Sequence, residues 1–167
     1  MEKDLQNADG IKKFTALVEE IRVCIFITHS PDHDHSRPMA TVDVDGDGRL
    51  WFFTDIRSVK VEEVSREATV HLVYAHPGKE SYLDVWGSAT IEQDKNLMKK
   101  KWSPAVKVYF PDGLEDPNLG LLSVKPQQVY YWDAGTGKMM AMIKMAAALV
   151  SGNTKLAKGE QGKINVG

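Results

Sequence analysis

Two strand-like segments on either side of a short glycine-rich turn constrain the fold of this chain more than any other feature. Residues 39–45 and 49–54 are rich in β-branched, aromatic and other apolar residues, and Gly46-Asp47-Gly48 lies between them. Glycine and aspartate readily adopt the backbone angles that tight hairpin turns need. The stretch therefore predicts an antiparallel hairpin. The residues after it predict a short helix over 58–66, with Val61 and Val64 facing inward and Glu62, Glu63 and Arg66 facing outward.

Most of the remaining chain has the pattern of further short strands. We expect them in the apolar or alternating segments 23–28, 68–74, 81–93, 119–124 and 128–133, with a bulge or kink at Gly87. Further helices are expected over residues 5–22, 94–102 and 139–150. In the first, apolar residues recur at helical spacing (Ile11, Phe14, Leu17, Val18 and Ile21), and in the second Asp94 is the expected N-cap. Strands and helices do not alternate as in a doubly wound nucleotide-binding fold. The pattern indicates a mainly β (α+β) protein, an antiparallel barrel or sandwich with peripheral helices.

Length and composition fit one globular domain. The chain has 167 residues, of which 43% are hydrophobic and 26% charged, with a formal net charge of −2. This charge argues against a nucleic-acid partner, and no stretch is long and apolar enough to predict a membrane span. Residues 1–150 are expected to form the domain, and residues 151–167, with almost no apolar anchors, a flexible tail. Because the N-terminus lacks the apolar core of a signal peptide, a cytoplasmic location is expected.

Two stretches have metal-ligand chemistry, and for each a structural interpretation is favoured. The aspartates at alternate positions in residues 43–47 resemble the start of a calcium loop, but Thr54 stands where such a loop needs a glutamate. A hairpin turn is the favoured interpretation. The histidine- and aspartate-rich segment 29–36 lacks the ligand spacing of a zinc site, and a solvated loop is favoured. We predict no metal site.

Two other features are also interpreted as structural. Cys24 is the only cysteine and lies in an apolar run, so a buried thiol is expected. Residues 135–138, Gly-Thr-Gly-Lys, match only part of a phosphate-loop pattern and predict a turn. No nucleophile with a neighbouring base is evident, so the catalytic residues are unknown.

Two cations and a hydroxyl are predicted to converge at one end of the hairpin. Arg37 opens one strand, and Ser58 and Lys60 open the helix that follows the next strand. A hairpin brings that strand start and that helix start to the same end of the sheet, where unpaired N–H groups of the helix add to an anion site. These side chains suit a dianionic phosphate monoester. Solvated surface charges are the alternative interpretation.

Short motifs between residues 11 and 133 follow one another in a familiar order. They are Arg37-Pro-Met-Ala-Thr41, Trp51-Phe-Phe-Thr54, Ser58-Val-Lys60, Trp86-Gly87, Lys101-Trp-Ser-Pro104, Tyr109-Phe-Pro-Asp-Gly113 and Val129-Tyr-Tyr-Trp-Asp133. This order resembles the pyridoxamine 5′-phosphate oxidase-like flavoproteins, most closely their general stress protein branch. The resemblance implies an antiparallel split β-barrel over residues 1–150, acting as a homodimer with FMN at the subunit interface.

The resemblance also implies a set of FMN-binding residues. They are Arg37, Pro38, Met39, Ala40, Thr41, Phe53, Thr54, Ser58, Lys60, Tyr82 and Trp132. Arg37 and Lys60, with Ser58 beside them, would hold the phosphate. Residues 38–41 would lie under the flavin, and residues 53–54 along its ring and ribityl chain. On the later strands, Tyr82 would contact the flavin and Trp132 would reach the FMN of the other subunit.

Two departures from the oxidase pattern weigh against pyridoxamine phosphate oxidation. Val59 replaces a basic residue of the phosphate motif, and residues 138–145 contain no arginine where the oxidase has an arginine-rich segment. The leading hypothesis is an FMN-binding protein of the stress-response type, functioning as a flavin-dependent oxidoreductase. The alternatives are a non-enzymatic module that binds or senses a flavin or another phosphorylated cofactor, and an interaction protein with an empty barrel.

Overall fold

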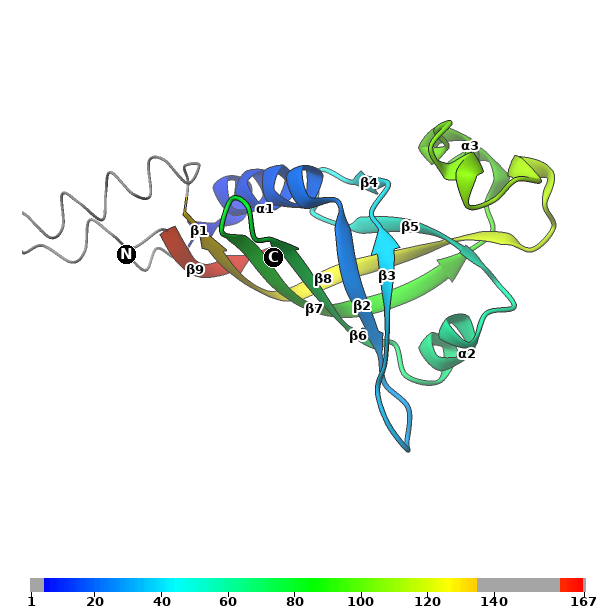
Figure 1. Ribbon diagram of the computed structural model, residues 1–167, viewed down its shortest axis with the longest axis horizontal. Coiled ribbons are helices and arrows are strands. Elements are labelled where there is room, and N and C mark those ends of the chain that lie inside the picture. The colour runs from blue at the N-terminus through cyan, green and yellow to red at the C-terminus, as the bar shows by residue number, and fades with distance from the viewer. Residues whose placement is uncertain (1–4, 135–159, 167) are drawn as a thin grey trace, which may run out of the picture.

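The computed structural model describes residues 5–134 and 160–166, and its strands form one curled, mostly antiparallel sheet (Figure 1). The strands are β1 (Leu5–Gln6), β2 (Val23–Thr28), β3 (His35–Ala40), β4 (Asp43–Val44), β5 (Leu50–Asp55), β6 (Thr69–His76), β7 (Ser81–Glu92), β8 (Leu119–Asp133) and β9 (Glu160–Asn165). Hydrogen-bonded neighbours follow the order β1-β9-β8-β7-β6-β2-β3, and β5 pairs with both β8 and β4. The sheet thus curls into a half-barrel, which confirms the predicted mainly β class.

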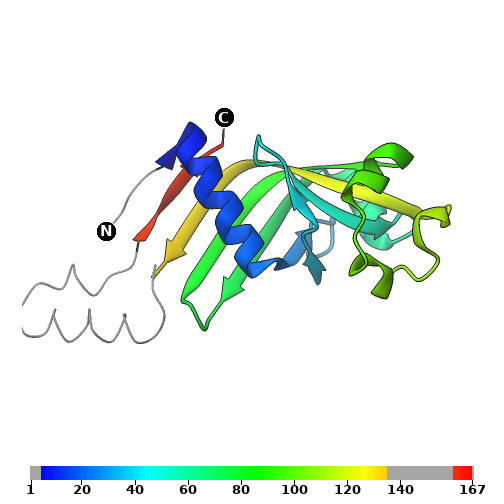
Figure 2. The same cartoon turned by 90° about the horizontal axis from the view of Figure 1, so that it is seen from above.

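Helices cover parts of this sheet. Within the described residues they are α1 (Asn7–Ile21), α2 (Val59–Arg66) and α3 (Lys95–Lys101), with 3-10 turns at Val106–Val108 and Gly113–Glu115. Figure 2 shows α1 lying across one face of the sheet. Its buried side chains Phe14, Leu17 and Val18 recur at helical spacing, as the sequence predicted. The side chain of Asp94 accepts two backbone N–H groups at the start of α3, so it is the expected N-cap.

Strand β5 lies between two apolar clusters. Its side chains alternate between the two faces of the sheet, and residues 50–54 are all buried. Phe52 belongs to the main core under α1, and its ring is nearly perpendicular to that of Phe26, with ring centroids 5.5 Å apart. Trp51 and Phe53 face a second cluster, which includes Met98 of α3. Strand β5 therefore anchors α3 to the barrel.

The predicted hairpin is present, but its first strand is interrupted. Backbone hydrogen bonds close the turn between Asp45 and Arg49, which confirms the turn interpretation. Strand β3, however, pairs with β2, and only the short β4 pairs with β5. The chain changes partner at Thr41, whose N–H donates to the Arg22 carbonyl, before Val42 bonds Trp51. Strand β3 also begins at His35, inside the segment predicted to be a loop.

The prediction of two separate strands over residues 119–133 is wrong. They form the single strand β8, which continues through Pro126 beside a register shift at Gly87 of β7. A Cβ added at Gly87 would lie 2.6 Å from the Lys125 carbonyl oxygen, so the close approach of the two strands requires glycine. The expected bulge is therefore confirmed, and it lets a proline lie inside a paired strand.

The segment expected to be a flexible tail contains a strand. β9 pairs with β8 on one side and with β1 on the other, and Ile164 is fully buried. Two apolar residues, Ile164 and the partly buried Val166, are enough here because two neighbouring strands supply the backbone hydrogen bonds. The turn expected at 135–138 and the helix expected at 139–150 lie outside the described residues, and the domain boundary at residue 150 stays a prediction.

Candidate functional site

The turn from β5 into α2 places a hydroxyl group without a partner at the start of the helix. The carboxylate of Asp55 accepts the backbone N–H of Arg57 at 2.8 Å and its guanidinium at 2.7 Å, which holds the turn. Ser58 is the N-cap residue, but its side chain does not cap the helix. Its Oγ is buried and has no hydrogen-bond partner among the described residues. Because a buried hydroxyl without a partner costs free energy, a ligand that hydrogen-bonds to the Ser58 hydroxyl would be stabilised here.

Lys60 lies in the first turn of α2, in an environment that disfavours its own charge. Burial, followed by the nearby charge of Arg37, lowers its pKa from 10.5 to about 8, against a smaller opposing effect of Asp55. Lys60 forms no salt bridge with any residue in the described part of the chain. An anion bound beside Lys60 would remove this penalty.

Arg37 reaches the same site from β3. In the β2–β3 register it lies opposite Phe26, so it faces the inner side of the half-barrel. One guanidinium nitrogen, Nη1, donates to Thr28 Oγ1 at 2.6 Å, and the other, Nη2, donates to Glu63 Oε2 at 3.2 Å. The structure therefore brings Arg37, Ser58 and Lys60 to the same end of the barrel, where the sequence predicted they would converge.

Glu63 is the residue at this site that sequence reasoning missed. We expected it to face outward from α2, which is wrong, because its side chain is 7% exposed. It accepts hydrogen bonds from Thr28 at 2.5 Å, from His35 and from Arg37. Burial alone would raise the pKa of Glu63, but these bonds lower it below its usual range. Helical spacing pairs Glu63 with Lys60, whereas its actual partners lie on β2 and β3, so the sequence carried no signal for these contacts.

Other predicted site residues are placed near β3 and β5. Pro38 is exposed on the edge strand β3, Met39 joins the core, and Thr41 bonds the Tyr74 hydroxyl at 2.7 Å. Ala40, the residue between them, is partly buried. Phe53 packs against Trp102 in the second cluster, with ring centroids 5.4 Å apart, and its neighbour Thr54 is buried.

Tyr82 and Trp132 lie on the other face of the sheet. They are cross-strand neighbours in the β7–β8 register and are 37% and 43% exposed. Leu83, which follows Tyr82, faces the core, so Tyr82 and Trp132 point outward. One chain therefore does not bring these two residues to the Arg37 side chain. Val23 and Ile25 of β2 are also exposed. Strand β6 lies between β2 and β7, with Val73 opposite Ile25 and Ala75 opposite Tyr82, so an apolar outer strip of Val23, Ile25, Tyr82 and Trp132 extends across β6.

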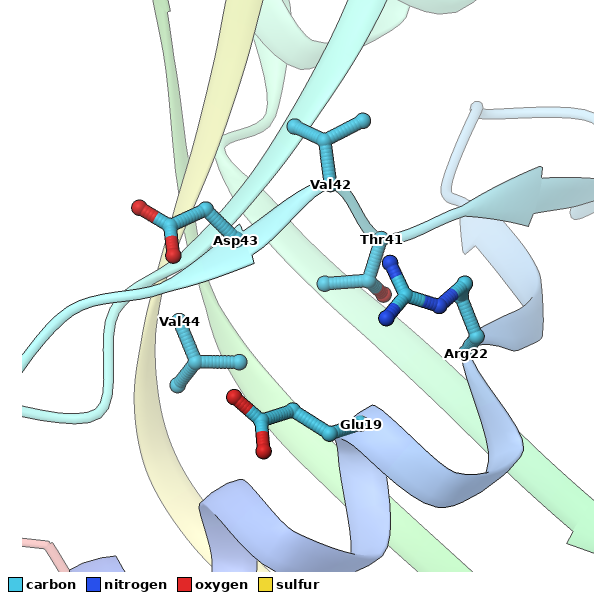
Figure 3. Close-up of a pocket in the computed structure, with 6 residues that line it drawn as sticks. All are labelled: Glu19, Arg22, Thr41, Val42, Asp43 and Val44. Atoms are coloured by element: carbon cyan, nitrogen blue, oxygen red, sulfur yellow. The ribbon is translucent and has the colours of Figure 1, made fainter. Parts of the chain in front are cut away.

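A shallow pocket at the end of α1 is lined by neither Arg37 nor Lys60 (Figure 3). It has a volume of about 50 Å³ and is lined by Glu19, Arg22, Thr41, Val42, Asp43 and Val44. Arg22 ends the helix with φ of 64°, and Figure 3 shows its guanidinium beside the Thr41 side chain. The volume suits a few water molecules and is too small for a nucleotide.

The acidic and histidine-rich stretches form contacts within the protein. Asp43 and Asp45 accept hydrogen bonds from Lys101 at 2.5 and 2.9 Å. His29 bonds Asp34 at 2.8 Å and stacks on the Trp86 ring. In residues 5–134 and 160–166, no group of three or more His, Cys, Asp or Glu side chains is arranged to hold a metal ion.

Cys24 is buried, as expected. Burial raises the pKa of its thiol to about 12, although a hydrogen bond with Tyr74 acts in the opposite direction. The thiol is therefore protonated and a poor nucleophile.

No helix in the described ranges combines the length and hydropathy needed to cross a membrane.

The curled antiparallel sheet, with a cation cluster where β3 meets α2, defines a protein of the split-barrel class. The family model for pyridoxamine 5′-phosphate oxidase-like proteins matches residues 9–155, and the chain belongs to this family. It is 32% identical over 134 residues to general stress protein 26 of Bacillus subtilis (strain 168), which corresponds to 77% of this chain and 93% of the relative.

Solved structures support the fold. A putative general stress protein 26 from Jannaschia sp. CCS1 superposes with a TM-score of 0.79 at 22% identity, covering 95% of this chain and 98% of that one. The general stress FMN/FAD binding protein from Xanthomonas citri superposes with a TM-score of 0.66 at 22% identity, covering 77% and 90%. The split-barrel fold and the general stress protein resemblance that the sequence predicted are thus confirmed.

Proposed function

We propose that this protein binds FMN and that Arg37, Lys60 and the Ser58 hydroxyl hold the phosphate group. The observation that carries the proposal is the incomplete electrostatics of the site. A lysine with a lowered pKa lies near Arg37, and a buried hydroxyl nearby has no partner among the described residues. A terminal phosphate dianion supplies the negative charge and the acceptor oxygens that these groups lack.

Family membership supports a flavin as the rest of the ligand. The Xanthomonas citri relative is described as an FMN/FAD binding protein. We favour FMN over FAD because a terminal monoester carries two negative charges that match the two cations, whereas a diphosphate linkage spreads its charge over two phosphorus centres. The segment 38–41 on the edge strand and the residues 53–54 of β5 remain candidates to border the flavin.

We also propose that the protein is a homodimer whose subunits meet through the outer strip of Val23, Ile25, Tyr82 and Trp132. Exposed apolar side chains that are contiguous on a sheet face are typical of an interface. In such a dimer Tyr82 and Trp132 would complete the flavin site of the other subunit, which explains why one chain keeps them apart from Arg37.

Ile25→Lys should yield a monomer in light scattering, while Thr90→Lys at an exposed position should not. A wild-type protein that is monomeric at all concentrations would refute this interface.

The activity that we propose is that of a flavin-dependent oxidoreductase in the cytoplasm. Bound FMN would supply the redox chemistry, and the chain's own residues would bind the phosphate, orient the ring and exclude water. Pyridoxamine phosphate oxidation is not proposed, because residues 138–145 contain no arginine. That same observation favours a second candidate, a flavin-binding module without turnover. Steady-state NADPH oxidation faster than with the same concentration of unbound FMN would exclude this second candidate.

The experiment that tests FMN binding compares two ligands that differ only in the phosphate. Calorimetric titration of ligand-stripped protein should give tighter binding for FMN than for riboflavin by about 10–100-fold, as expected for charge-assisted hydrogen bonds. A protein that purifies without flavin absorption and shows no thermal shift with excess FMN would refute the proposal. Equal affinity for the two ligands would refute the role of the cations.

A further inference from the structure

The carboxylate of Glu63 connects three segments around Arg37. It accepts hydrogen bonds from Thr28 on β2, from His35 and Arg37 on β3, and it projects from α2 itself. Thr28 is fully buried and also accepts a bond from Arg37, so its hydroxyl joins both side chains. Networks of this kind hold their members in fixed orientations when every polar group is paired.

Arg37 keeps binding capacity after these contacts are made. A guanidinium carries five N–H donors in a planar fork. Among the described residues, Thr28 and Glu63 take up two of these donors, both on the terminal nitrogens. The side chain is 25% exposed, so it is not fully enclosed by the protein. Arg37 can therefore be held on one edge and bind a ligand on another.

Glu63 does not neutralise the whole site. Its hydrogen bonds go to Arg37, His35 and Thr28, whereas Lys60 has no salt bridge within the described ranges. A carboxylate that served only to cancel positive charge would be expected to pair with the lysine as well. Of the two cations Arg37 and Lys60, the Glu63 carboxylate pairs only with Arg37, and this contact orients the guanidinium.

We propose that Glu63 is a positioning residue for phosphate recognition: with Thr28, it fixes the guanidinium of Arg37 so that its remaining N–H donors meet the phosphate. This inference rests on the proposed function. Two other roles are distinguishable from it. Glu63 could act only as a structural tie between α2 and the sheet, or it could compete with the phosphate for Arg37.

The test is a pair of titrations, with FMN and with riboflavin, on the wild type, Glu63→Gln and Glu62→Gln. Glu62 is the matched control because it lies next in sequence on the same helix, is 60% exposed and pairs only with Arg66 among the described residues. Glu63→Gln should lower FMN affinity about tenfold and leave riboflavin affinity within about twofold. Glu62→Gln should leave both unchanged.

The alternatives give different results. An equal loss for both ligands would overturn the proposal in favour of a structural tie, and tighter FMN binding by Glu63→Gln would overturn it in favour of competition. Unchanged FMN affinity would also overturn it. If the wild type itself does not prefer FMN to riboflavin, the proposed function fails first, so the two failures are distinguishable.

A double-mutant cycle tests whether Glu63→Gln acts through Arg37, and the variant Thr28→Val keeps the proposal testable if Glu63→Gln folds poorly. In an Arg37→Met background, Glu63→Gln should no longer change the ratio of FMN to riboflavin affinity, because the residue it positions is gone. A second variant, Thr28→Val, removes the hydroxyl shared by Arg37 and Glu63 while keeping the Glu63 carboxylate, and should lower FMN affinity by about threefold. A persistent effect of Glu63→Gln in the Arg37→Met background would refute the positioning role.

Discussion

Lys60 and Lys101 are both poorly accessible lysines near the end of a helix, yet their surroundings are opposite. The side chain of Lys101 is 8% exposed, its Nζ bonds Asp43 and Asp45, and it lies 4.6 Å from the centre of a Trp51 ring. Burial alone would lower the pKa of Lys101, but the hydrogen bonds to Asp43 and Asp45 raise it. For Lys60, burial and the charge of Arg37 lower the pKa to about 8.

The difference separates a structural cation from a binding cation. Lys101 completes a network that joins α3 to the β4–β5 hairpin, and nothing in that network calls for a ligand. Lys60 and the Ser58 hydroxyl are left without partners in the described part of the chain, so folding leaves an electrostatic cost that a ligand can remove. Proteins keep such costs mainly at functional sites.

The largest effect on stability should come from breaking the network of Lys101 with Asp43 and Asp45. Lys101→Met should lower the free energy of unfolding by about 3 kcal/mol, because Asp43 and Asp45 are left facing each other without a cation. Urea denaturation measures this loss. Lys99→Met, at an exposed position on the same helix, is the control and should change stability by less than about 0.5 kcal/mol. Equal losses of unfolding free energy in the two variants would refute the structural role of Lys101.

The second prediction concerns ligand affinity. Lys60→Met should weaken FMN binding by about 2 kcal/mol, since it removes a charge-assisted contact to the phosphate, and should leave riboflavin binding nearly unchanged. Calorimetric titration of both ligands provides the comparison. Riboflavin affinity that falls as much as FMN affinity would show that Lys60 does not contact the phosphate.

The third prediction is that the same variant is more stable than the wild type without ligand. Because the folded pKa of about 8 lies below the unfolded value of 10.5, the folded state disfavours the charged lysine. The cost is fully present below pH 8 and disappears as pH rises from 8 to 10.5. Lys60→Met should therefore gain about 1 kcal/mol at pH 7 and lose most of that gain near pH 10. Destabilisation at pH 7 would contradict an unpaired lysine.

The smallest effect is expected at Ser58. Replacing an N-cap serine with alanine usually costs about 1 kcal/mol of stability. Here the hydroxyl does not cap the helix, so Ser58→Ala should change the unfolding free energy by less than about 0.5 kcal/mol while weakening FMN binding a few-fold. Thermal melts and titrations check the two parts. A full capping loss would show that the hydroxyl already has a partner in solution.

Local patterns predicted much of this fold. The glycine-rich turn at 46–48, the N-cap at Asp94 and the bulge at Gly87 depend on neighbouring residues or on one close backbone contact, and all three are present. The end of β3 at Ala40 and the strand β9 were not predicted, because each depends on a partner strand that is distant in sequence. The same limit applies to Glu63, whose inward orientation follows from contacts with β2 and β3.

By itself the sequence determined the strand periodicity, the positions of turns and caps, and the family to which the chain belongs. Only the tertiary structure decided which lysine is paired and which is left for a ligand. Lys101 ends a run of three lysines, and its partner Asp43 lies 58 residues away, while Arg37 and Glu63 are 26 residues apart. Charge pairing and burial arise between distant segments, so they exist only once the chain has folded.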